Sequence, residues 1–242
     1  EHSFKDPLQI NSSRLSELKE EMMFHLKKNI NLRKFSPLDH VALSNGKTTF
    51  KKKETSGGAR SKGQFDKDCT NIIEQQFRIG CTTKTPDEQR IIAISEIKTR
   101  DLLYIAREAT KEINNNPYDV YGKDRWSYYN FLKKGDNIYH LLADQTKCGW
   151  TFPMELMAAY FECAYKLYPD YEPFRIIRDD FKDGNIYFYI EGVKHKPKRG
   201  FILGMWDNVC SFIMSCIFSI YKKKMMKLDP EISDKHVSGM FY

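Results

Sequence analysis

The segment from Phe201 to Tyr221 limits the folds open to this chain more than any other part of it. Its sequence, FILGMWDNVCSFIMSCIFSIY, is mostly apolar, whereas the chain as a whole is polar, with a mean hydropathy of -0.59. A helix needs about 20 mainly apolar residues to cross a bilayer. The segment therefore predicts a C-terminal hydrophobic helix at 201–221. Such a helix can span a membrane, lie in its interface, or form the buried core of a soluble domain.

Polar side chains in this segment recur on one face. Asp207, Ser211, Ser215 and Ser219 are spaced by four residues, so they share one side of a helix. Small residues at this spacing let a second helix approach closely in a membrane, although the same stripe also suits a core helix packed on a polar network. The apolar residues favour insertion by about 3–5 kcal/mol and Asp207 opposes it by up to about 3 kcal/mol. The residues predicted to contact a membrane or a packed helix are Phe201, Gly204, Trp206, Asp207, Ser211, Ser215 and Ser219.

Basic residues flank the apolar segment on both sides. These residues contribute to the net charge of +7 of the whole chain. A positive charge of this size suits acidic partners such as anionic lipid, nucleic acid or an acidic protein surface. Each lysine near an anionic membrane contributes about 1 kcal/mol of attraction, whereas in a solvated loop it contributes nothing. The residues predicted to contact an anionic surface are Lys194, Lys196, Lys198, Arg199, Lys222, Lys223 and Lys224.

The rest of the chain shows mainly helical patterns. Apolar residues at three- and four-residue steps predict an N-terminal amphipathic helix within 1–35, and a polar, basic linker follows at 36–65. Helices are also expected at 66–79, at 85–113 with a possible break near 98–101, at 124–134, 136–147 and 151–167. A capping box at Thr85–Glu88 marks the second of these. Alternating residues predict one small hairpin at 174–190, with Ile186, Phe188 and Ile190 facing inward.

These patterns predict a mainly α fold. We expect an irregular helical bundle over 66–200 that carries the small hairpin, followed by the hydrophobic helix and a basic tail at 222–242.

Six cysteines leave the redox state open. Cys69 with Cys81, and Cys148 with Cys163, are possible disulfide pairs, but reduced core thiols fit the sequence equally well. The cysteine spacing matches no zinc motif.

No sequence motif indicates a catalytic residue, metal site or cofactor. The chain lacks H-E-x-x-H and phosphate-loop patterns, and the calcium-like run from Asp179 to Gly184 would put Phe181 and Ile190 at ligand positions. We therefore expect a non-enzymatic, membrane-associated interaction or scaffold protein with protein partners. It would act as a subunit of a larger complex or as an effector at a membrane. The second possibility is a soluble basic module that binds nucleic acid or is assembled into a ribonucleoprotein, and the third is an enzyme of unfamiliar type.

Overall fold

The computed structural model describes residues 4–6, 9–35, 43–44, 58–59, 69–85, 88–121, 148–200, 205–231 and 241. The helices are α1 (Ser12–His25), the 3-10 helix η2 (Leu32–Phe35), α2 (Ile97–Ile113), α4 (Cys148–Thr151), α5 (Met154–Leu167), α6 (Glu172–Asp183) and α7 (Asp207–Leu228). The strands are β1 (Leu43–Ser44), β2 (Gly58–Ala59), β3 (Gln75–Thr85), β4 (Glu88–Ser95), β5 (Ile186–Ile190) and β6 (Val193–His195).

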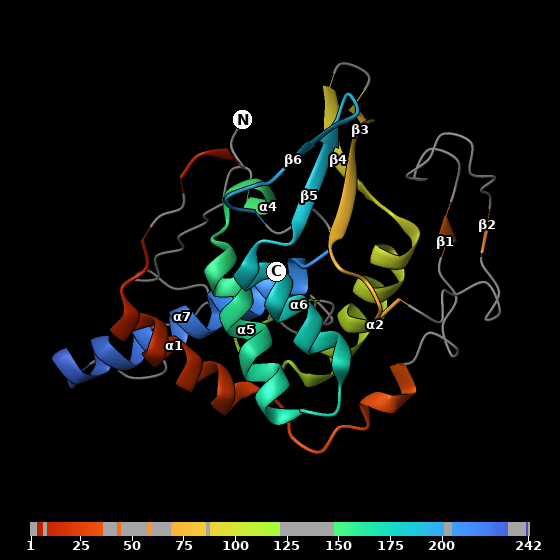
Figure 1. Ribbon diagram of the computed structural model, residues 1–242. Coiled ribbons are helices and arrows are strands. Elements are labelled where there is room, and N and C mark those ends of the chain that lie inside the picture. Colours follow the sequence, from red (N-terminus) through yellow and green to blue (C-terminus); the bar gives the residue numbers. More distant parts are fainter. Residues whose placement is uncertain are drawn as a thin grey trace.

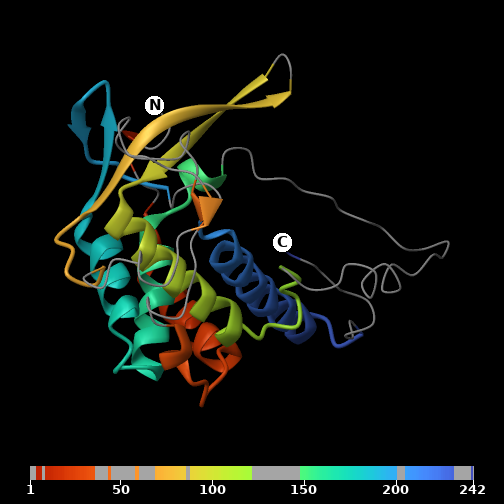
Figure 2. The same cartoon turned by 90° about the vertical axis from the view of Figure 1, so that its right-hand side faces the viewer.

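Four strands form a mixed sheet in the order β4-β3-β5-β6. The long β3–β4 hairpin is antiparallel, β5 pairs parallel to β3 over Gln75–Arg78, and β6 returns antiparallel to β5. Because β5 pairs with only the first residues of β3, the rest of the β3–β4 hairpin extends beyond the helices (Figure 2). Side chains alternate across β5, so Ile186 and Phe188 are buried, whereas Ile190, also expected to face inward, is only half-buried.

The helices form a layer below the sheet, with α5 and α6 on one side, α2 beside them, and α7 behind (Figure 1). α1 packs along both α5 and α7. The shared core is rich in large aromatic side chains, each of which buries a large apolar area. The largest fully buried residues include Trp206, Tyr160, Phe77, Phe161, Phe174 and Phe212.

The mainly α prediction is wrong, because the fold is mixed α/β. The expected helix over 66–79 is replaced from Gln75 onward by β3, and the start of the expected helix over 85–113 is β4. The capping-box pattern at Thr85–Glu88 lies at the tip of a hairpin, and α2 begins only at Ile97. β-branched residues in both strands favour this outcome, and pairing with the distant β5 completes it.

The expected strand at 174–178 is also wrong. This stretch belongs to α6, where Pro173 occupies the first turn and Phe174, Ile177 and Phe181 share the buried face. Gly184, with φ of +68°, ends the helix in the left-handed conformation that glycine adopts without strain. The hairpin is instead formed by β5 and β6.

The transmembrane prediction for 201–221 is wrong as well. α7 begins at Asp207, so 15 residues precede Lys222, and about 20 apolar residues are needed to span a bilayer. Among the described residues, every helix is too short or too polar for a transmembrane span. The helix continues to Leu228, seven residues into the segment expected as a basic tail.

Several other predictions can be placed only in part. The N-terminal helix is present but ends at His25, and the helix expected over 151–167 begins at Met154. The helices expected at 124–134 and 136–147 lie outside the described residues. So does most of the 36–65 linker.

Candidate interaction surface

The serine stripe of α7 faces the interior of this chain. Ser211 Oγ donates a hydrogen bond of 2.6 Å to Asp119 Oδ1, and Ser215 Oγ donates 2.7 Å to the Phe212 carbonyl within the same helix. Ser219 Oγ lies 3.5 Å from His25 Nε2 on α1. These contacts hold α7 to the 114–121 segment and to α1.

The other residues predicted at this face have different surroundings. Trp206 is fully buried and meets the Phe161 ring edge-on, with 5.0 Å between ring centroids. Asp207 is half-buried at the start of α7. Phe201 and Gly204 lie outside the described residues.

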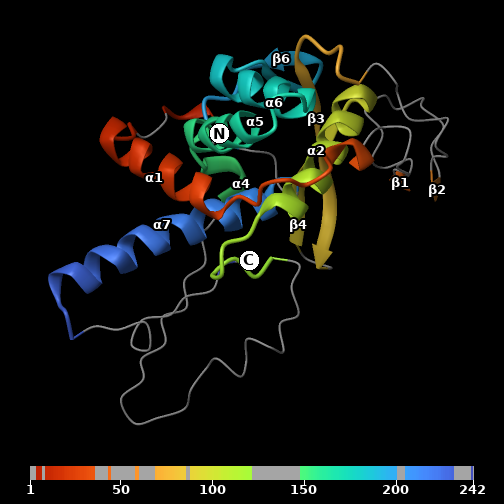
Figure 3. The same ribbon diagram turned by 90° about the horizontal axis from the view of Figure 1, so that it is seen from below.

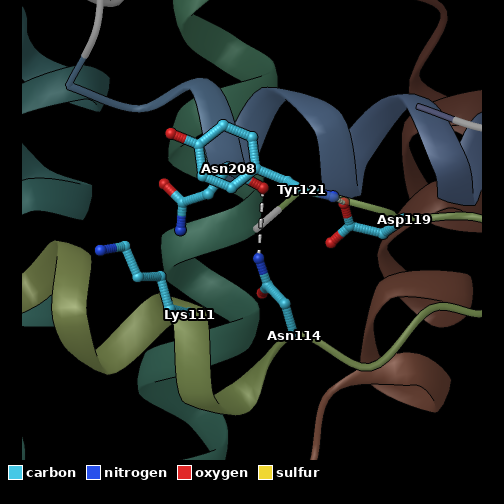
Figure 4. Close-up of a pocket in the computed structure, with 5 residues that line it drawn as sticks. All are labelled: Lys111, Asn114, Asp119, Tyr121 and Asn208. Atoms are coloured by element: carbon cyan, nitrogen blue, oxygen red, sulfur yellow. Dashed lines mark hydrogen bonds between the residues drawn. The ribbon is translucent and has the colours of Figure 1, made fainter. Parts of the chain in front are cut away.

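A small polar hollow lies beside the start of α7 (Figure 4). It measures about 270 Å³ including its opening to solvent, which is below the range of most ligand pockets. Figure 4 shows side chains converging on it from α2, α7 and the segment that follows α2. The lining residues are Lys111, Asn114, Asp119, Tyr121 and Asn208.

Most polar groups of this hollow already bond within the chain. Asn114 donates 3.3 Å to the Asn208 carbonyl and accepts 2.6 Å from the Tyr160 hydroxyl. Asn208 Nδ2 donates 2.7 Å to Thr110 Oγ1, whereas its Oδ1 is buried without a hydrogen-bond partner. These bonds join α2, α5 and α7, so the hollow is part of the structural network between helices.

The basic residues at 222–224 are compensated by neighbouring side chains. Lys223 Nζ lies 2.5 Å from Glu21 Oε2, and Lys224 Nζ lies 2.5 Å from Glu17 Oε2, both on α1. Burial is the largest single influence on Glu21 and raises the pKa of this carboxyl, but the hydrogen bonds from Lys223, Ser219 and His25 together with the Lys223 charge outweigh it, so the pKa is lowered. Lys222 is buried and donates 2.9 Å to the Tyr118 hydroxyl.

The basic cluster at 194–199 is compensated in the same way. Lys194 Nζ pairs with Glu74 at 2.6 Å and lies 3.9 Å from the Tyr187 ring centroid. Lys198 pairs with Asp6 at 2.5 Å, and Lys196 donates 3.0 Å to the Asp183 carbonyl. Arg199 is half-buried at the end of this group. Acidic or carbonyl oxygens therefore reduce the positive potential that these residues present to an external partner.

The outer side of α7 carries an exposed apolar stripe that the sequence analysis did not identify. Ile217 is 37% exposed, Tyr221 60% and Leu228 86%, and Lys224 lies between them. Their spacing of four, three and four residues puts them on one face of the helix. We call these four residues the α7 stripe. The C-terminal part of α7 that bears it extends away from the main body of helices (Figure 3).

A sequence signal for the α7 stripe exists, because Leu228 continues the spacing of Ile217 and Tyr221. It is hidden by Lys222, Lys223 and Lys224, which make this part of the sequence look like the start of a solvated tail. Only the extension of α7 to Leu228 puts the apolar residues into register.

Burial raises the pKa of several titratable groups among the described residues. Burial raises the pKa of the Cys163 thiol to about 12, and it raises the pKa of the Cys216 thiol, so both favour the unreactive protonated form. Burial also raises the pKa of Asp180 to about 7, while Gln75 Nε2 donates 2.8 Å to its carboxylate. Within the described ranges, no cluster of His, Cys, Asp and Glu could hold a metal ion.

The six cysteines are reduced in the structure. Cys148 Sγ lies 3.5 Å from Cys210 Sγ on α7, whereas Cys163 Sγ donates 3.6 Å to the Lys19 carbonyl. Cys69 is buried, and Cys81 is exposed on β3. The structure therefore gives Cys148 a sulfur neighbour other than the one expected.

No protein-family model and no curated protein matches this chain. Its function is therefore inferred from the geometry of its own surface, where the α7 stripe is the strongest feature.

Proposed function

We propose that this chain is a non-enzymatic interaction protein, a subunit that docks to another protein through the α7 stripe. The single observation that carries the proposal is the exposure of Ile217, Tyr221 and Leu228 on one face of a helix that extends from the body. An amphipathic helix with apolar residues at these intervals is a common way to enter a hydrophobic groove of a partner.

The chemistry of the stripe indicates its partner. Tyr221 and Leu228 offer apolar contact area, and Tyr221 also carries a hydroxyl that can bond at the edge of an interface. Tyrosine is among the residues that most often dominate the binding energy of interfaces. The complementary surface is an apolar groove that can accept a helix.

Local charge favours a protein groove over a membrane surface or nucleic acid. An anionic bilayer or a phosphate backbone attracts lysines that lack nearby acidic partners. Lys224, within the stripe, and Lys223 beside it instead pair with carboxylates of α1. The apolar contact area then supplies more of the binding energy than the charges do.

A photo-crosslinking amino acid in place of Tyr221 tests this proposal in extracts of cells that express the protein naturally. The matched control carries the same amino acid in place of Val193, which is 57% exposed on β6. We expect the Tyr221 position to give one discrete heavier product and the Val193 position to give none. Equal products from both positions would contradict the proposal.

A triple variant, Ile217→Glu with Tyr221→Glu and Leu228→Glu, separates the possible occupants of the stripe. If the partner is a protein, the variant elutes alone from a size-exclusion column, whereas the wild type elutes in a larger complex. Flotation of purified wild type with phosphatidylserine vesicles, lost in the variant, would assign the stripe to a membrane interface and overturn a protein partner.

A further inference from the structure

Cys148 and Cys210 bring two sulfur atoms together from distant parts of the chain. Cys148 is the first residue of α4, Cys210 lies in the first turn of α7, and their Sγ atoms are 3.5 Å apart. A disulfide bond has a length of about 2.05 Å, so the sulfurs need to approach by about 1.5 Å. Side-chain rotation can supply a movement of this size.

The backbones on both sides are held in place by contacts that do not involve the sulfurs. On the α4 side, Gly200 N donates 2.8 Å to the Phe152 carbonyl, and the Trp150 ring lies 5.7 Å from the Phe188 ring. On the α7 side, Cys210 N donates 2.9 Å to the Trp206 carbonyl. The two sulfurs are thus neighbours because of the fold.

The two thiols differ in access and acidity. Cys148 is partly exposed, whereas Cys210 is 8% exposed. The hydrogen bond between the thiols and burial both raise the pKa of Cys210 well above its ordinary range. Cys148 is therefore the thiol that an external reagent reaches first.

We propose that Cys148 and Cys210 are a redox-modification site, at which a low-molecular-weight disulfide converts the two thiols into an intramolecular disulfide bond. The Cys148 thiolate attacks one sulfur of the oxidant, forming a mixed disulfide and releasing one thiolate. Cys210 then loses its proton and attacks Cys148 Sγ, which breaks the mixed disulfide and releases the second thiolate. The protein loses two electrons and two protons, and the oxidant becomes two thiols.

The bond would change the molecule in a measurable way. It links α4 to the base of α7 and closes the chain between them into a loop of about 60 residues, which restricts the unfolded state. For a domain of this size, the expected rise in melting temperature is about 5–10 °C. The stability of the unit that contains α5, α6 and β5 then depends on the redox state.

Incubation of the full chain with oxidised glutathione, followed by alkylation and peptide mapping without reductant, tests the proposal. We expect one peptide pair that joins Cys148 to Cys210, and the rise in melting temperature should disappear after reduction. Cys81→Ser, which removes an exposed thiol on β3, should retain both results. Cys148→Ser should abolish both.

The wild-type peptide map decides the outcome even if a variant folds poorly. A glutathione adduct on Cys148 with an alkylated, unlinked Cys210 would overturn the proposal, and so would a bond from Cys148 to any other cysteine. The rate should rise between pH 7 and pH 9, because both steps need a thiolate.

Discussion

Single residues in this fold gain their importance from burial. Asp180 shows this, because its carboxylate lies inside the molecule, where Gln75 Nε2 donates one hydrogen bond and Gln75 Oε1 has no partner. If the side-chain amide of Gln75 rotates by half a turn, its Oε1 faces Asp180. A protonated Asp180 can then donate a hydrogen bond to this oxygen, whereas the ionised carboxylate cannot. Burial therefore favours the neutral acid.

Asp180 should make the protein less stable as the pH rises. Its pKa is about 7 when folded against 3.8 ordinarily, so between these values the folded state binds more protons and stability falls with rising pH. Across this pH range, the free energy of unfolding falls by at most about 4 kcal/mol because of Asp180. Between pH 5 and pH 8, the free energy of unfolding measured by urea titration should fall by about 2–3 kcal/mol more for the wild type than for Asp180→Asn.

The variant Asp170→Asn is the control, because this carboxylate is exposed in the turn between α5 and α6. It should keep the pH dependence of wild type. Parallel pH profiles for wild type and Asp180→Asn would show that the buried acid is not responsible.

Phe188 should matter far more to stability than its neighbour Tyr187. Phe188 is 4% exposed and its ring meets Phe77 and Trp150, so Phe188→Ala should lower the free energy of unfolding by about 3–5 kcal/mol. Tyr187→Ala removes a half-buried ring and one contact with Lys194. Equal losses in denaturant titrations would contradict the inward orientation of Phe188.

Among the elements, α7 has two different halves. Its first half is buried and bonded through serine and asparagine side chains to the 110–119 region, and its second half carries the exposed α7 stripe. The apolar character that resembles a membrane segment in the sequence is used for the core. Asn208 Nδ2, Ser211 and Ser215 within it are hydrogen-bonded, as most buried polar groups in folded proteins are, whereas Asn208 Oδ1 has no partner.

Two buried serines of α7 should differ in their effect on stability. Ser211→Ala removes the donor to the buried Asp119 carboxylate and should lower the free energy of unfolding by about 1–3 kcal/mol. Ser215→Ala, one turn later, removes only a bond to a carbonyl of its own helix and should lower it by less than about 1 kcal/mol. Thermal or urea unfolding measures both, and a larger loss for Ser215→Ala would contradict this assignment.

At the scale of the whole molecule, the net charge of +7 overstates the positive potential of its two basic clusters. Carboxylates of α1 and Glu74 lie against lysines that are far away in the sequence. Exposed pairs of this kind add little stability, but each shields a charge from external partners.

Removal of these carboxylates should strengthen binding to polyanions. We expect Glu17→Gln with Glu74→Gln to need more salt than wild type for elution from heparin, because Lys224 and Lys194 lose their partners. Glu155→Gln with Glu191→Gln, at two exposed positions, makes the same change in net charge and should shift elution less. Equal shifts would show that net charge alone governs binding.

Local patterns in the sequence determined several elements by themselves. The periodicity of Leu18 and Met22 predicts α1, and the stripe of Leu156, Tyr160 and Cys163 predicts α5, because a helix buries the face that its spacing defines. The alternation around Phe188 likewise predicts β5 and its inward side.

Tertiary structure alone decided the class of the fold and the candidate surface. The strand character of Gln75–Arg78 depends on pairing with Ile186–Tyr189, more than 100 positions away, which no local window contains. The same limit applies to α7, whose apolar first half is buried by α2, α5 and the 114–121 segment rather than by lipid. Local hydropathy does not distinguish a buried strand from a buried helix, or a protein core from lipid. Long-range packing determines which of these environments each segment occupies.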